Sequence, residues 1–268
     1  MLELLLINYV VAALSGLLVG SISVTLTTSR SITFGLTLLH SILGGNLLGV
    51  YLSSLYNLTI PIPLVSTLTA IALSIIVGEL IERGLSEDMA IAFSVSIATT
   101  MTIIFGYLAS QVSSLAITKA WTYIAGTSSI SSIEDLAKLT LTLFIVLPIV
   151  HLLFKEFKYI AFDEDGAKAL GLNIRFYRYV FYSLAALSAS ILSSTIGILA
   201  THVVLSVPGI IYIKFFKRYN IAFSYLIGVV IMLVGYYLAS LLSISPSGGV
   251  GLTSILTVLG VTVYGRRS

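Results

Sequence analysis

Long apolar runs alternate with short polar connections along almost the whole chain. A helix that crosses the hydrocarbon core of a bilayer needs about 20 predominantly apolar residues. The pattern predicts spans at residues 4–28, 32–55, 62–81, 89–110, 136–154, 177–198, 200–213, 221–242 and 250–264. The sequence therefore predicts an all-α fold, a polytopic transmembrane helical bundle of about nine spans that forms one domain over residues 1–268.

Residues 112–135 do not fit this series of spans, because their apolar residues are interleaved with polar ones. The segment contains Trp121 and Tyr123, and both residue types are enriched where a membrane meets water. We expect an amphipathic segment that lies at the membrane surface.

The composition supports a membrane protein and excludes several other classes. The chain is 57% hydrophobic and 9% charged, whereas soluble domains carry about 25% charged residues. It has no cysteine, which excludes disulfides, iron–sulfur clusters and thiolate metal sites. The lipid bilayer is thus the expected surrounding, in a multi-pass protein of the cell (plasma) membrane.

The basic residues predict the orientation. With the amino terminus outside, every Lys and Arg except Lys119 and Lys138 lies on the inner side of the membrane. Such an excess is typical of cytoplasmic connections. We expect the N-terminus outside and the C-terminus inside. Because the basic residues cluster in the inner connections, the pI near 9.0 does not indicate nucleic-acid binding.

The span at 200–213 is short and interrupted. A helix of this length rises about 21 Å, less than the ~30 Å hydrocarbon core. It contains Thr201, His202 and Ser206, and a helix break is expected at Pro208 and Gly209. Short, broken spans with polar residues are typical of transport pathways, and the alternative is a kinked helix buried in the bundle.

The longest inner connection, 155–178, contains a short predicted helix with its own start and stop signals. Asp163 can cap the first turn, and Gly171 can end the helix in the left-handed conformation with Leu172 packing back. Small residues in the helix and apolar residues beside it suit docking to a cytoplasmic partner: Gly166, Ala167, Ala169, Phe162 and Leu170. A solvated connector is the alternative.

Four groups of positions, in order along the chain, resemble the permease subunit of the ABC-type importers for zinc, manganese or iron. They are Arg30, Gly35, Leu38, His40 and Gly44 or Gly45; Phe162-Asp163, Ala167 and Gly171-Leu172; Gly197-Ile198-Leu199 and Pro208; and Pro246-Ser247-Gly248.

The resemblance implies an assembly. It implies a homodimer with a second copy of the chain, separate ATP-binding cassette ATPase subunits on the 155–178 coupling loop, and an extracytoplasmic substrate-binding protein. ATP would bind the ATPase subunits and no cofactor would bind this chain. The sequence has no phosphate-binding P-loop, so we expect no enzymatic activity from the chain itself.

One departure from the family concerns the metal pathway. The family has Asp where this chain has Leu36, and Ser where it has Leu39, so of the implicated Asp and His only His40 remains. A single imidazole is a poor site for a hard cation that prefers carboxylate oxygen. We expect His40 to line the pathway. His202 is the candidate second ligand. The alternative is a core histidine for His40 and an interfacial histidine for His202.

Glu79 is the carboxylate placed clearly inside a predicted span, so it is a candidate for the pathway. The alternative is an ion pair with Arg83, four residues later in the same helix. The small pair Gly16 and Gly20 is a candidate helix-packing face.

Two other functional classes remain open from the residues alone. A self-contained secondary transporter or channel would work without ATP and would show paired internal repeats. A membrane-embedded enzyme would need convergent polar groups at one depth, and the sequence shows only scattered ones.

Overall fold

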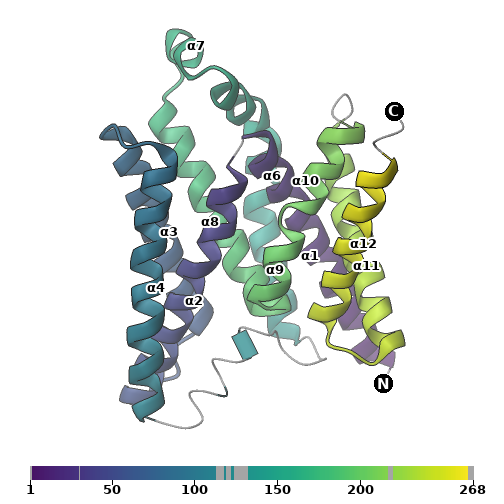
Figure 1. Ribbon diagram of the computed structural model, residues 1–268. Coiled ribbons are helices and arrows are strands. Elements are labelled where there is room, and N and C mark those ends of the chain that lie inside the picture. Colours follow the sequence, from purple (N-terminus) through teal and green to yellow (C-terminus); the bar gives the residue numbers. More distant parts are fainter. Residues whose placement is uncertain are drawn as a thin grey trace.

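The computed structural model describes residues 2–29, 31–112, 118, 122–123, 132–216 and 220–264, with the side chains of residues 2–5 and 264 left aside (Figure 1). The described residues form helices and no strand. In chain order the elements are α1 (Leu2–Thr28), α2 (Ile32–Tyr56), α3 (Ile62–Glu82), α4 (Glu87–Val112), α6 (Ile133–Phe162), α7 (Glu164–Ala169), α8 (Ile174–Ile196), α9 (Ile198–Val204), α10 (Val207–Ile211), the π-helical turn η1 (Tyr212–Phe216), α11 (Ala222–Leu242) and α12 (Pro246–Tyr264).

The described part of the chain contains nine helical stretches that are long and apolar enough to cross a membrane. One of them, Ile198–Phe216, consists of α9, α10 and η1 in succession. The prediction of an all-α polytopic bundle with about nine spans is therefore confirmed. Most of the predicted interfacial segment 112–135, including Trp121, lies outside the described residues.

The start of α1 and the end of α12 lie at opposite ends of the bundle, as Figure 1 shows. The short helix α7 and the end of α12 lie at one end, and the start of α1 lies at the other. We call the first the α7 end. The connections from α1 to α2 and from α3 to α4 also lie there.

Helices α1, α2 and α8 form the centre of the bundle and others form its periphery. In their apolar stretches 72%, 61% and 72% of the residues are buried, against 22% in α4 and in α12. The central helix α1 packs against α6 and α11, while α2 packs against α3 and α4. The peripheral helices expose many apolar side chains, which suits a lipid environment.

Local sequence signals set several helix starts. Ser132 and Asp135 form a reciprocal capping box at the start of α6. The Asn173 side chain accepts a hydrogen bond from the Phe176 N–H at the start of α8, at 3.0 Å. Each cap satisfies a backbone donor that the first helical turn leaves free.

Glycines allow α1 and α11 to approach closely. A Cβ atom on Gly16 or Gly20 would overlap the backbone of α11 near Val229 and Ser224. The Ser224 hydroxyl donates to the Gly20 carbonyl at 2.8 Å across the same contact. The predicted packing face of Gly16 and Gly20 is thus present, and it uses the close backbone approach that small residues permit between membrane helices.

Candidate transport site and coupling segment

His40 and His202 lie side by side although 162 positions separate them in the numbering. The rings come from α2 and α9, their centroids are 5.8 Å apart, and their planes are inclined by 88°. The His40 side chain is exposed on the single chain and that of His202 is half-buried. Sequence reasoning selected both histidines, and the fold brings them together.

The hydrogen bond of His202 determines which of its nitrogens is free. Its Nδ1 atom lies 3.2 Å from the Ile198 carbonyl oxygen. Because a carbonyl oxygen only accepts, this bond requires a proton on Nδ1, and Nε2 then carries the lone pair. A backbone hydrogen bond of this kind is the usual way in which proteins orient a metal-binding imidazole.

The predicted helix break lies directly after the His202 segment. The helix α9 ends at Val204, and Pro208 stands in the first turn of α10. The Gly209 N–H donates to the Ser23 hydroxyl of α1 at 2.8 Å, and a Cβ atom at Gly209 would overlap α1. Pro208 and Gly209 are buried. They therefore position the broken helix against α1 and do not form an exposed surface.

Glu79 is not part of the histidine pair. Its carboxylate accepts a hydrogen bond from Arg83 Nε at 3.0 Å, which is the pair expected from the sequence. It also accepts bonds from Arg175 Nη2 at 2.8 Å and from the Tyr179 hydroxyl at 3.1 Å, both on α8. The structure therefore places Glu79 in an ion-pair network that joins α3 to α8.

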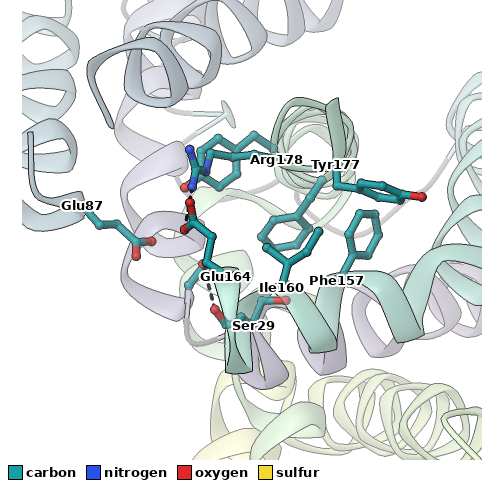
Figure 2. Close-up of a pocket in the computed structure, with 11 residues that line it drawn as sticks. Ser29, Glu87, Phe157, Ile160, Glu164, Tyr177 and Arg178 are labelled. Atoms are coloured by element: carbon teal, nitrogen blue, oxygen red, sulfur yellow. Dashed lines mark hydrogen bonds and ion pairs between the residues drawn. The ribbon is translucent and has the colours of Figure 1, made fainter. Parts of the chain in front are cut away.

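Arg178 joins three elements in this network. Its side chain is 14% exposed and forms ion pairs with Glu82 of α3 and Glu164 of α7, the second at 3.2 Å. Figure 2 shows the Arg178 and Glu164 side chains pointing toward one another. Sequence reasoning missed these contacts, because no short-range spacing connects residues 82 and 178.

The capping signals of α7 are present in the structure. The Asp163 carboxylate accepts a hydrogen bond from the Gly166 N–H at 2.9 Å. At the other end Gly171 has a φ of 81°, and the Leu172 N–H donates to the Ala167 carbonyl at 3.1 Å. These bonds form a Schellman motif, so the short helix has a defined start and end.

The surface of this segment differs in part from the sequence expectation. Phe162 is 81% exposed and Leu170 is 71% exposed, and Ala169 is exposed beside them. Ala167 is fully buried, so it packs inward and is not available to a partner. The predicted 155–178 loop is also more helical than expected, because α6 continues to Phe162 and α8 begins at Ile174.

The charged groups of α7 add to its order. The Lys168 ammonium pairs with Glu164 at 2.9 Å. The hydrogen bond to Glu164 raises the pKa of the Lys168 side chain above its usual value. Glu164 thus forms one ion pair within α7, with Lys168, and another with Arg178 of α8.

A cavity of about 270 Å³ lies beside α7 at this end of the bundle. Figure 2 shows Phe157, Ile160 and Tyr177 on its apolar side, with Glu164 and Arg178 on its polar side. The cavity therefore lies next to the Glu164–Arg178 ion pair, which joins α7 to α8.

The described residues contain no group of three or more His, Cys, Asp or Glu that could hold a metal ion. The two imidazoles of His40 and His202 are potential metal ligands that come together in one copy. An exposed pair of this kind can be completed by water or by groups from another copy.

The comparison with known families decides the identity of the chain. The sequence pattern of the ABC 3 transport family matches residues 1–265. The chain belongs to this transporter family. None of the curated proteins matches the chain.

Solved structures agree with this assignment at the level of the fold. PsaBC from Streptococcus pneumoniae in complex with Fab is 18% identical, with a TM-score of 0.77 over 94% of this chain and 88% of that one. A metal-chelate type ABC transporter in an inward-facing conformation is 19% identical, with a TM-score of 0.64 over 94% of this chain and 84% of that one. The family member described here shares their helical architecture.

Proposed function

We propose that this chain is the membrane-spanning permease of an ATP-driven importer for a divalent transition-metal ion. It works as a homodimer in the plasma membrane, with its amino terminus outside. Separate ATPase subunits bind the α7 end, and an extracytoplasmic protein delivers the ion. The family match supports a transporter, and one similar structure is described as a metal-chelate type ABC transporter.

The His40–His202 pair is the observation that carries the metal assignment. Ionisable side chains within membrane helices are costly and most often functional. Here two of them converge from different helices, one of which is broken. His40 is exposed on the single chain, so a second copy can approach it across a two-fold axis. A dimer would then supply four imidazoles.

The α7 segment, by which we mean residues 162–172, provides the contact for the ATPase. Its exposed residues Phe162, Ala169 and Leu170 combine two large apolar side chains with a small one. Burying each large side chain contributes roughly 1.5–3 kcal/mol before the costs of association. Since Asp163 and Gly171 fix both ends of the helix, it can transmit a movement as a unit.

The test is metal uptake by cells that express His40→Ala or His202→Ala with the native partner subunits. We expect each variant to lower uptake about 10–100-fold at unchanged membrane abundance, as loss of a metal ligand or its support does. His151→Ala is the matched control, since His151 lies on the exposed side of α6, and it should leave uptake unchanged. Normal uptake in both test variants would remove the histidines from the pathway.

Dependence on ATP separates the proposal from a secondary transporter or channel. Uptake into vesicles should require ATP and should stop when the ATPase subunit is inactivated. Uptake that continues without ATP would contradict the importer.

A further inference from the structure

The described carboxylates lie near the ends of the bundle's helices and not beside the histidine pair. They stand in the last or first two turns of helices or in the connections, at the start of α4, the end of α3 or near the end of α6 for example. His40, in contrast, is the ninth residue of α2, and no carboxylate is among the groups that interact with His202. The sequence also has no cysteine. Nitrogen is therefore the strong ligand atom at this point of the bundle.

The spacing of the two rings suits a shared ion that prefers nitrogen. Zn²⁺ binds imidazole at about 2.0–2.1 Å with tetrahedral geometry, which places two coordinating ring centroids roughly 5 Å apart. The observed separation of the centroids is 5.8 Å. The rings meet edge to face, and rotation of the exposed His40 side chain can bring a ring nitrogen to the ion.

We propose that the His40–His202 pair makes this importer selective for Zn²⁺ over Mn²⁺, an inference that rests on the proposed function. Imidazole suits Zn²⁺, whereas Mn²⁺ favours carboxylate, carbonyl and water oxygen. For the same ligands Zn²⁺ also binds more strongly than Mn²⁺. A pathway with two imidazoles and no carboxylate therefore retains Zn²⁺ and gives Mn²⁺ little to replace its hydration shell.

Leu36 offers a direct way to change this ligand set. It stands one turn before His40 on α2, so residues 36 and 40 lie on the same face of the helix. A carboxylate introduced here can reach an ion held by the pair. Leu36→Asp should therefore add the oxygen ligand that Mn²⁺ prefers, while both histidines remain.

The experiment measures uptake of radioactive Zn²⁺, and in parallel of radioactive Mn²⁺, in cells that lack other zinc and manganese importers and that express this permease with its native partners. In the competition assay the label is on Zn²⁺. Unlabelled Mn²⁺ serves as competitor. We expect Mn²⁺ to compete poorly in the wild type, and about tenfold or more better in Leu36→Asp. Thr33→Asp is the matched control, because Thr33 is exposed one turn before Leu36 in the same helix and thus farther from His40, and it should leave the competition unchanged.

The outcomes separate the selectivity from the function on which it rests. If the wild type takes up neither metal, the importer proposal fails. If it takes up Zn²⁺ and Mn²⁺ equally, the importer stands and the selectivity is wrong. An equal gain in Mn²⁺ competition in Leu36→Asp and Thr33→Asp would assign the effect to added charge and would also contradict it.

Membrane abundance is measured for each variant. If Leu36→Asp does not accumulate in the membrane, His202→Asp replaces it in the same competition assay. It exchanges one nitrogen ligand for an oxygen ligand and should favour Mn²⁺. Unchanged competition by Mn²⁺ in that variant would overturn the proposal.

Discussion

Ala167 and Ala169 stand two residues apart in the same short helix, yet their surroundings are opposite. Ala169 is exposed beside Leu170, whereas Ala167 is fully buried. A substitution at each position therefore tests a different property. A substitution of Ala169 tests contact with a partner, and a substitution of Ala167 tests the packing of α7.

We expect Ala169→Arg to reduce co-purification of the ATPase and ATP-driven uptake while membrane abundance stays normal, because the added side chain points outward. Ala167→Arg should lower abundance as well, since an unpaired charge in a buried position costs several kcal/mol. The measurement is abundance, co-purification and uptake for both variants. Wild-type coupling in Ala169→Arg would exclude this face of α7 as the contact.

The sequence predicted individual residues of the site better than their contacts. Asp163 and Gly171 were predictable because capping depends on neighbours within a few positions. The orientation of Ala167 was not, because small size permits either a docking surface or a buried position. His40 and His202 stood out as histidines in apolar helices, but their pairing depends on how α2 and α9 pack.

At the scale of elements, α3 and α8 are joined near both ends. At the α7 end Glu79 pairs with Arg175, and Arg178 pairs with Glu82. Near the other end the Ser190 hydroxyl bonds to Ser66 at 2.9 Å and to Thr67 at 2.8 Å. The same Arg178 also holds Glu164 of α7. A displacement of α7 is therefore transferred to two membrane helices that are joined to each other.

We predict that Glu164→Gln weakens the coupling of ATP hydrolysis to uptake severalfold. Loss of a partly exposed ion pair contributes only about 0–1 kcal/mol to stability, so the fold should persist. The measurement is metal transported per ATP hydrolysed in vesicles. Asp165→Asn removes the same charge from the same helix without contacting Arg178, and should leave the ratio unchanged. Equal ratios in Glu164→Gln and the wild type would exclude this ion pair from coupling.

The whole bundle shows which features of a fold hydropathy can predict. The number of spans was predictable because burial in lipid requires long apolar stretches. The end of α6 was not, because Lys155 and Lys158 mark the end of the apolar run but not the end of the helix. Likewise, the break between α9 and α10 could be expected from Pro208, while its attachment to Ser23 of α1 could not.

The orientation of the whole molecule leads to the last prediction. Among the described residues, the α7 end carries most of the basic side chains, including Lys155, Lys158, Lys168 and Arg175, so it should face the cytoplasm. Because the chain has no cysteine, single substitutions report position without background labelling. Ser245→Cys, exposed between α11 and α12, should react with an impermeant thiol reagent added to intact cells. Ser86→Cys, exposed between α3 and α4 at the α7 end, should react only after the membrane is opened. The reverse pattern would place the α7 segment outside, where an ATPase cannot reach it, and would contradict the orientation and the coupling role together.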